Sequence, residues 1–294
     1  MTPGIPFQFK ELRVVTTAGW VARDLAGGTP LPVVHDLGLD VPPVTTWTAW
    51  WAGHRFIARL AATPGVTRPD LWSPGPGWVT TVDPTWLGRR VWAGPLADVA
   101  TSDLWDAPLV SGVTVFAKPA EVKVDRLPAR GYGTPTGFIG DAERAGLEPS
   151  SPVVLSGVVV FTEEYRCFIA PDPATGRPRV VAASAYLVDG RTWDSWEAPD
   201  LAPDPTEAVT FAQAVADETA GPPGYVLDVG RLVDGTWAVV EPNASWSSNP
   251  YHCDPTGVVA SILAAQDPAG DRSWAWRGDP TLARFARPLP VRST

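Results

Sequence analysis

The sequence predicts an α+β protein with more than one domain. Its 294 residues exceed what one ordinary domain requires, and the balance of 45% apolar and 19% charged residues is typical of a globular chain. β-Branched and aromatic stretches alternate with stretches of helical periodicity. The 33 prolines and 27 glycines divide the chain further. These observations predict short strands and helices joined by rigid loops.

Residues 1–107 are predicted to form an N-terminal domain. Proline and glycine break this segment often, so its elements should be short. We expect a strand at Leu12–Thr16 and helices at Arg55–Ala62 and Leu96–Trp105.

Residues 108–268 are predicted to form a second domain. Val113–Ala117 is β-branched and aromatic, which predicts a strand that leads into Lys118. A loop rich in Gly, Pro and Arg follows to Gly137. The acidic first turn and the closing glycine of Asp141–Gly146 indicate a short helix. Two long β-rich stretches come next, Val153–Ile169 and Val180–Val188.

The end of this domain combines a helix, a hairpin and a second helix. Apolar residues at helical spacing predict the first helix over Thr206–Ala220. Strands at Tyr225–Arg231 and Thr236–Glu241 flank Asp234-Gly235, a strong hairpin signal. Asp254-Pro255 then provides a cap and a first-turn proline for the second helix.

Composition restricts the class of partner. A net charge of −9 disfavours nucleic acid, because a phosphate backbone would be repelled. No apolar run approaches the about 20 residues that cross a bilayer. The first residues lack the basic and apolar regions of a signal peptide, so we expect no membrane partner and a cytoplasmic location. Most of the 15 tryptophans are expected to anchor the core and loops, and residues 269–294 to form a tail packed on the second domain.

Lysine is rare in this chain, and two of its three lysines lie close together. Lys118 and Lys123 follow the strand predicted at 113–117, whereas 20 of the 23 cationic residues are arginine. A lysine pair in such a chain suggests a site for compact point charges, such as those that contact phosphate oxygens. Chance clustering is the alternative.

A pair of acids in the predicted hairpin suggests a metal site. A two-residue turn at Asp234-Gly235 would place Asp228 directly opposite Glu241, with Asn243 on the same face. Opposed carboxylates repel each other by a few tenths to about 1 kcal/mol. A divalent cation would offset this repulsion, with Asn243 as a neutral oxygen ligand. The alternative is a solvent-facing hairpin on which both acids are hydrated.

Five segments, in order over about residues 112–265, resemble the ATP-grasp superfamily, and within it the clade named for one arginine and two lysines. The resemblance implies an ATP-grasp fold, in which two α+β subdomains grip ATP, preceded by an α/β domain of the pre-ATP-grasp type on the substrate side. It also implies a hinge near residues 154–161. The segments are Val115–Pro119 with Lys123, Phe161–Phe168, Val181–Tyr186, Tyr225–Gly230 and Val240–Ser245.

The resemblance assigns the ATP contacts. Lys118 and Lys123 would contact the phosphates, and the hinge, with Ser156, Val158 and Val160, would hold adenine. Relatives usually carry an acidic hinge residue for the ribose hydroxyls, where this chain has Ser156 followed by Gly157. The resemblance therefore predicts an altered contact to the ribose.

The resemblance also assigns the catalytic and metal-binding residues. Arg166 would steady the phosphates or an acyl phosphate, with Glu164 orienting it at the ATP site. Arg166 and Lys123 are therefore the expected catalytic residues. The expected Mg²⁺ ligands are Asp228, Glu241 and Asn243.

The function implied is an ATP- and Mg²⁺-dependent ligase that joins a carboxylate, of an amino acid or peptide, to an amine. The carboxylate would attack the γ-phosphate to give an acyl phosphate and ADP, and the amine would displace phosphate. Such chemistry needs positioning and charge neutralisation and no protein nucleophile. Two alternatives remain: a phosphotransferase or regulatory pseudoenzyme of the same fold, and a Trp-rich binding module without enzymatic activity.

Overall fold

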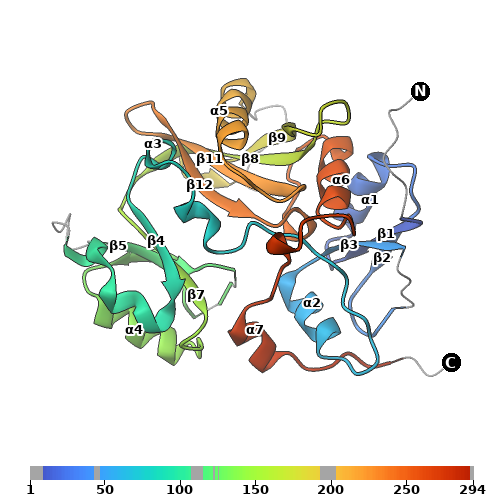
Figure 1. Cartoon of the computed structure of the whole chain (residues 1–294), viewed down its shortest axis with the longest axis horizontal. Helices are drawn as coiled ribbons and strands as arrows, with labels where there is room; N and C mark the ends of the chain where they lie inside the picture. The colour runs from blue at the N-terminus through green and yellow to red at the C-terminus, as the bar shows by residue number, and fades with distance from the viewer. Residues whose placement is uncertain are drawn as a thin grey trace.

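The computed structural model describes residues 9–42, 47–106, 115–121, 123–124, 126–192 and 203–291. Its strands form three sheets (Figure 1). In the view of Figure 1 a three-stranded sheet lies on the right, a four-stranded sheet at the lower left, and a five-stranded sheet above them. The last two sheets are those that hold the residues expected at the nucleotide site.

The three-stranded sheet is parallel and has the order β2-β1-β3. The helix α1 lies between β1 and β2 and provides the crossover that their parallel pairing needs. The expected strand at 12–16 and the expected helix at 55–62 correspond to β1 and α2 and are confirmed. The elements are β1 (Glu11–Val15), α1 (Gly19–Gly27), β2 (Val33–Asp36), β3 (Thr48–Ala52) and α2 (His54–Ala61).

The four-stranded sheet is antiparallel and has the order β4-β7-β5-β6. One face is covered by α4 (Pro135–Arg144), whose Phe138 and Ala142 are fully buried against the strands. The sheet takes its first strand from the N-terminal third of the chain. The strands are β4 (Val91–Pro95), β5 (Val115–Pro119), β6 (Arg130–Tyr132) and β7 (Pro152–Ser156).

Two predicted elements around this sheet differ from the structure. The helix expected at 96–105 is two 3₁₀ helices, η2 (Leu96–Thr101) and η3 (Asp103–Asp106), because Ser102 between them has an extended backbone. Asp141 does not begin a helix. It lies within α4, which begins six residues earlier, where the Thr134 hydroxyl accepts a hydrogen bond from Gly137 N at 3.2 Å. Val113, Thr114 and the domain boundary placed at 107/108 fall outside the described residues.

The five-stranded sheet is antiparallel with the order β10-β9-β8-β11-β12. The β-rich stretch expected over 153–169 is divided here, because residues 157–160 connect β7 of the smaller sheet to β8 of this one. This connection coincides with the expected hinge. The strands are β8 (Phe161–Pro171), β9 (Pro178–Val188), β10 (Arg191–Thr192), β11 (Tyr225–Leu232) and β12 (Trp237–Asn243).

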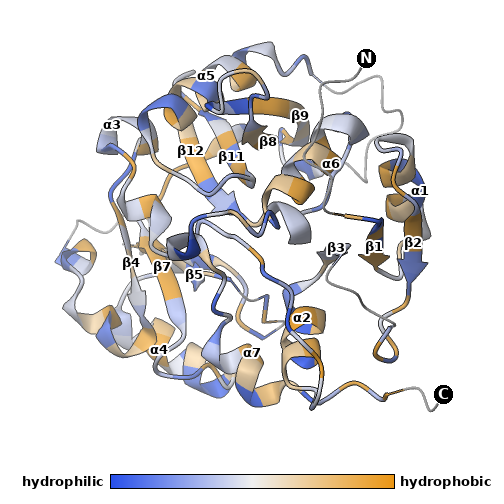
Figure 2. Ribbon diagram, turned by 45° about the vertical axis from the view of Figure 1, so that its right-hand side comes forward, coloured by the Kyte–Doolittle hydropathy of each residue, from blue (hydrophilic) through white to orange (hydrophobic). Residues whose placement is uncertain are grey.

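Two helices sandwich the five-stranded sheet. α5 (Thr206–Glu218) covers one face, and α6 (Pro255–Ala264) packs on the other, over β8 and β9. The Asp254 carboxylate accepts from Thr256 N at 2.7 Å, so the expected cap of α6 is confirmed. Hydropathy colouring shows apolar residues concentrated along β7, β11 and β12 (Figure 2).

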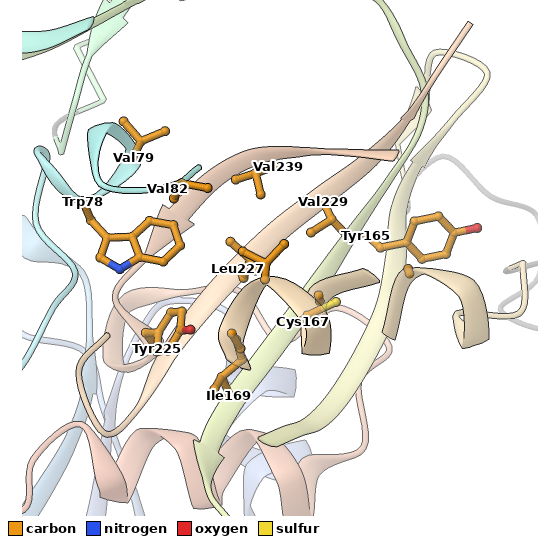
Figure 3. Close-up of a cluster of buried hydrophobic side chains, with 14 of the residues drawn as sticks. Trp78, Val79, Val82, Tyr165, Cys167, Ile169, Tyr225, Leu227, Val229 and Val239 are labelled. Carbon is orange, nitrogen blue, oxygen red and sulfur yellow. The ribbon is translucent and has the colours of Figure 1, made fainter. Parts of the chain in front are cut away.

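The core under α5 also includes a short segment from the N-terminal third. Trp78 and Val79 of η1 (Trp78–Thr80), and Leu87 of α3 (Pro84–Leu87), pack against the sheet (Figure 3). Five of the 15 tryptophans have at most 3% exposure, which agrees with a structural role for these five: Trp50, Trp72, Trp78, Trp246 and Trp276.

The tail packs on two parts of the molecule. The Thr281 hydroxyl of α7 (Pro280–Phe285) lies 2.6 Å from the Ser151 hydroxyl, next to β7. Leu289 N donates to the Thr63 hydroxyl, just after α2, at 2.9 Å. Two further short helices among the described residues are η6 (Ser245–Ser247) and η7 (Arg272–Trp274). No helix among the described residues has the length and apolar character needed to cross a membrane.

Candidate active site

The hairpin of β11 and β12 brings Asp228 opposite Glu241, as expected, but through a different turn. The expected two-residue turn at 234–235 is wrong. Leu232 N donates to Thr236 O at 2.8 Å, which leaves three residues in the loop. A β-bulge between Asp228 and Val229 shifts the register by one residue and so restores the predicted pair.

Arg89, which follows α3, satisfies the carbonyl groups of this bulge. Its guanidinium donates to Val239 O at 2.7 Å and to Val240 O at 2.8 Å, and also to Leu87 O at 3.0 Å. Carbonyls displaced from a ladder need another donor when they are shielded from water. Arg89 therefore fixes the bulge, and with it the face of the sheet on which Glu241 lies.

Asp228 is fully buried and is held by Arg166 of the neighbouring strand β8. Arg166 Nε donates to Asp228 Oδ1 at 2.9 Å, and Nη2 donates to Oδ2 at 2.7 Å. Its remaining Nη1 donates to Asn249 O at 3.2 Å. β8 is interior to the sheet, so Arg166 is not an edge-strand side chain that extends into solvent. Burial lowers the pKa of Arg166, but the Asp228 carboxylate outweighs this and raises it overall.

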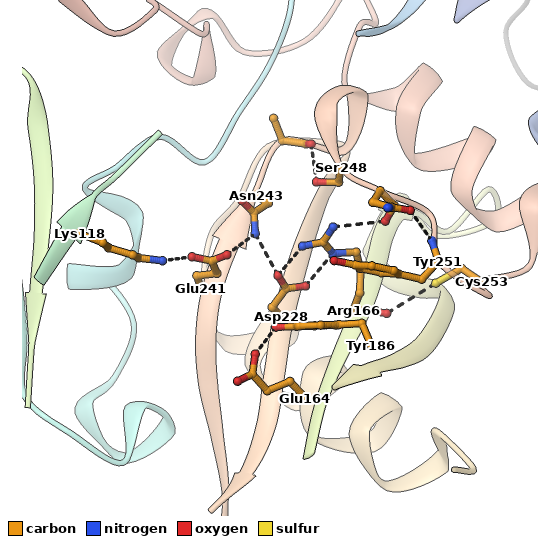
Figure 4. A network of polar contacts seen from close by, with 12 residues as sticks. Lys118, Glu164, Arg166, Tyr186, Asp228, Glu241, Asn243, Ser248, Tyr251 and Cys253 are labelled. Atoms are coloured by element: carbon orange, nitrogen blue, oxygen red, sulfur yellow. Dashed lines mark hydrogen bonds and ion pairs between the residues drawn. The ribbon is translucent and has the colours of Figure 1, made fainter. Parts of the chain in front are cut away.

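Two tyrosines flank the Arg166 guanidinium. The Cζ atom of Arg166 lies 5.5 Å from the ring centre of Tyr186 and 4.9 Å from that of Tyr251. The Tyr186 hydroxyl donates to Glu164 (Figure 4). The expectation that Glu164 orients Arg166 is thus wrong, because Asp228 does so. Glu164 holds Tyr186, and burial raises the pKa of the Glu164 carboxyl.

Lys118 reaches across from the four-stranded sheet to the five-stranded sheet. Its ammonium on β5 pairs with Glu241 on β12 (Figure 4). Asn243 Nδ2 donates to Glu241 Oε1 at 3.1 Å and to Asp228 Oδ2 at 3.0 Å. Burial lowers the pKa of Lys118 to about 8, with Asp228 acting in the opposite direction. The Lys118–Glu241 pair therefore connects the four-stranded sheet to the five-stranded sheet.

The opposed acids do not need a metal ion to offset their repulsion. Arg166 neutralises Asp228, and Lys118 neutralises Glu241. The alternative of hydrated acids on a solvent-facing hairpin is also wrong, because Asp228 is fully buried. The sequence predicted the pair correctly and did not predict its partners.

The donors present are suited to Mg²⁺. The carboxylate of Glu241 and the amide of Asn243 provide hard oxygen ligands on one face, and both are partly exposed. Asp228 is fully buried and already accepts from Arg166 and from Asn243. Among the described residues, no group of three or more His, Cys, Asp or Glu side chains is placed to hold a metal ion. A site here would thus rely on Glu241, Asn243 and the phosphates of a nucleotide.

The remaining expected site residues lie apart from this network. Ser156 is buried at the end of β7, whereas Val158 and Val160 in the connection have 47% and 61% of their surface exposed. Lys123 is exposed beyond β5, close enough to contribute to the lowered pKa of Lys118. The structure thus joins six of the expected site residues in one polar network: Lys118, Glu164, Arg166, Asp228, Glu241 and Asn243. It leaves four outside this network, namely Ser156, Val158, Val160 and Lys123.

Sequence reasoning missed three residues of the site. Arg89 carries no motif, and its role depends on a bulge that sequence does not reveal. Tyr186 was part of a matched segment but was given no role. Tyr251 has a φ of 50°, unusual for a residue other than glycine, and is placed by the loop that precedes α6. Aromatic residues near an expected arginine were the only available signal.

The chain has no match among curated proteins. Solved structures similar to it include D-alanyl-alanine synthetase A from Vibrio cholerae O1 biovar eltor str. N16961 (10% identity, 90% of this chain and 100% of that chain, TM-score 0.46). Another is carboxyaminoimidazole ribonucleotide synthase from Aspergillus clavatus, complexed with ATP (11% identity, 97% of this chain and 80% of that chain, TM-score 0.45). The D-alanine-D-alanine ligase from Coxiella burnetii is 11% identical, with 60% of this chain and 52% of that chain covered and a TM-score of 0.38. The match thus spans about half of that protein.

The family comparison covers most of the region that carries the site. Residues 60–263 match the model of the ATP-grasp domain of family 3 in the clade named for one arginine and two lysines. This match spans well over half of the chain and includes all six residues of the polar network. It also agrees with the two antiparallel sheets joined by a short connection. The protein therefore belongs to family 3 of this clade of ATP-grasp proteins and has the ATP-grasp fold.

Proposed function

We propose that this protein is an ATP-dependent ligase that joins a carboxylate to an amine through an acyl phosphate. The observation that carries the proposal is the contact of Lys118 with Glu241 between the two sheets, beside the buried Arg166–Asp228 pair. Cationic and oxygen-donor groups thus alternate on the facing surfaces. A triphosphate with its metal ion presents the complementary alternation of charge.

In this proposal Lys118 exchanges partners when the nucleotide binds. Its ammonium would move from Glu241 to a phosphate oxygen, and Glu241 with Asn243 would then hold Mg²⁺. Bound Mg²⁺ would neutralise part of the charge on the phosphates. Arg166 is kept rigid by Asp228 and by the two tyrosine rings. A cation fixed in this way needs little reorganisation as charge develops.

The reaction proposed has two steps. The carboxylate oxygen of one substrate attacks the γ-phosphorus of ATP, which forms an acyl phosphate and releases ADP. The amine nitrogen then attacks the acyl carbon, the bond to the phosphate oxygen breaks, and a proton leaves the nitrogen. Amino acids or peptides are the proposed substrates, and the cytoplasm, where ATP is available, is the proposed compartment.

The test is ATP turnover. The purified protein, ATP and Mg²⁺ are incubated with pools of amino acids and peptides, and ADP and new amide products are measured. We expect ADP release that depends on both a carboxylate and an amine, and loss of this activity in Lys118→Met. Lys10→Met, just before β1 of the three-stranded sheet, is the matched control and should remain active. Absence of ADP with every pool would contradict the proposal.

A nucleotide-binding protein without ligase activity is the second candidate. The observation that favours it is that Asp228 and Glu241 are each already neutralised by a cation of the protein. Calorimetry with ATP and Mg²⁺ distinguishes the two: a regulatory protein binds the nucleotide but yields no ADP. A Trp-rich binding module has less support, because residues 60–263 match an ATP-grasp domain.

A further inference from the structure

A cavity of about 420 Å³ lies beside the strand that carries Lys118. Three segments line it: residues 73–78 with η1, the ends of β5 and β7, and residues 273–278 of the tail. Its walls are largely aromatic and apolar, with Trp78, Trp274 and Trp276 among them. Glu121 is the one carboxylate among the described lining residues.

A second carboxylate lies close to Glu121 and is fully buried. Asp279 caps α7: its Oδ1 accepts from Thr281 N at 2.7 Å and from the Ser151 hydroxyl at 3.0 Å. Its other oxygen, Oδ2, is buried and has no hydrogen-bond partner. Asp279 is not among the residues that line the cavity, so it acts on Glu121 through its charge and raises the pKa of that carboxyl.

The indole nitrogen of Trp276 is a second polar group close to Glu121. Trp276 lines the cavity and is 3% exposed, and its Nε1 makes no hydrogen bond within ordinary limits. This nitrogen lies near enough to the Glu121 carboxylate to favour the ionised form of Glu121. Arg277 is exposed at the rim, and none of the ion pairs among the described residues joins it to Glu121. Among the described residues, no ion pair therefore offsets the charge of Glu121 when its carboxyl is ionised.

From these observations we propose that the cavity binds the ammonium group of an amine substrate, with Glu121 as its counter-ion and the tryptophans enclosing an apolar body. A tryptophan ring attracts a cation, and Trp274 is the partly exposed one of the three, whereas Arg68 already lies over the ring of Trp276 at 5.7 Å. The proposal rests on the function proposed above, because it names the site and chemical class of the second substrate. Glu121 follows Lys118 by three residues, which span at most about 11 Å, so the two sites adjoin.

The titration of Glu121 agrees with this geometry. Burial raises the pKa of Glu121 to about 7, and the nearby charge of Asp279 adds to the increase, while Trp276 opposes it. A bound ammonium group would favour the ionised carboxylate. Amine binding should therefore strengthen as the pH rises through 7, where Glu121 gains its charge. The other charged groups near Glu121 are Asp279, behind it, and Arg277, at the rim of the cavity.

The test measures binding without ATP, by tryptophan fluorescence and calorimetry. The probes are the primary amines phenethylamine and hexylamine, the neutral 2-phenylethanol, and the carboxylate 3-phenylpropionate. We expect an amine to bind more tightly than both comparison compounds, and Glu121→Gln to weaken it by about tenfold or more, since a charge-assisted contact is lost. Glu143→Gln, an exposed glutamate on α4, is the control and should bind as the unchanged protein does.

Three results would overturn the proposal. They are an affinity for amines that Glu121→Gln leaves unchanged, no saturable binding of either amine at millimolar concentration, and preferential binding of 3-phenylpropionate through Arg277. Circular dichroism verifies that Glu121→Gln is folded.

The outcome is separable from that of the ligase test. Glu121-dependent amine binding without any ADP release would remove the proposed function and keep the cavity. ADP release with an unchanged KM for the amine in Glu121→Gln would remove the cavity and keep the function.

Discussion

Replacement of Arg166 by methionine tests the most buried charge pair of the site. Methionine keeps the apolar stem of the side chain but leaves Asp228, which is fully buried, without its two donors at 2.9 and 2.7 Å. Removing one member of a buried ion pair costs about 3–5 kcal/mol. Asn243 Nδ2 still donates to Asp228 Oδ2 at 3.0 Å, so we expect the lower part of this range, about 3 kcal/mol.

The assay is urea unfolding followed by circular dichroism. With a slope of about 2–3 kcal/mol per M of urea, a loss of about 3 kcal/mol moves the midpoint down by about 1–1.5 M. The double variant Arg166→Met, Asp228→Leu should recover most of this loss, because an apolar pair of similar volume replaces the ions. Arg284→Met removes an exposed pair with Glu148 and should change the free energy of unfolding by less than about 1 kcal/mol.

Two results would refute this reasoning. One is a loss below about 1 kcal/mol in Arg166→Met, which would mean that Asp228 is hydrated in solution. The other is a double variant no more stable than the single one, which would mean that the arginine stabilises the sheet through its tyrosine contacts and not through its charge.

Other predictions concern the lysine, the bulge and one glycine. Calorimetry should show that ATP affinity falls as the pH rises from about 7 to 9, because Lys118, with a pKa of about 8, loses its charge. The variant Lys118→Arg should remove this pH dependence. An ATP affinity that does not change with pH in the unchanged protein would contradict the prediction. Arg89→Met should cost about 2–3 kcal/mol in thermal unfolding, since three carbonyls lose their donor; a change within about 0.5 kcal/mol would show that the bulge holds without it. Gly257→Ala should lower the free energy of unfolding by about 1–3 kcal/mol or more in the same assay, because the new Cβ would lie 2.1 Å from Val181 O. The control is Gly27→Ala, whose Cβ meets nothing within 4 Å and which should be neutral or mildly stabilising.

Local signals in the sequence predicted much of the fold. Asp254-Pro255 begins α6, and the β-rich stretch at 180–188 lies within β9. These signals act within a few residues, so no tertiary information is needed. The helix expected at 96–105 failed because Ser102 is extended between two 3₁₀ turns, which apolar periodicity does not distinguish from one helix.

The candidate site was predicted in part. The pairing of Asp228 with Glu241 came from the hairpin, and the five segments resembling ATP-grasp proteins ordered the rest. The contacts that neutralise the acids could not be predicted, because Arg166 is 62 residues from Asp228 and Lys118 is 123 residues from Glu241. Only the packing of the sheets sets which cation meets which acid. Arg89 was missed for the same reason, since it contacts a strand 150 residues later.

The loop at 233–235 has a consequence for how this chain tolerates length changes. An exposed hairpin tip is usually where insertions and deletions are accepted. Here the Leu232–Thr236 pair closes the loop, so a residue can be added to or removed from the tip without a change in strand register. The bulge in β12 is different, because pairing without it would place Val240 opposite Asp228 and turn Glu241 towards Leu227 and the apolar layer under α5. Length can therefore vary at this tip, whereas the irregularity in the strand has to be kept.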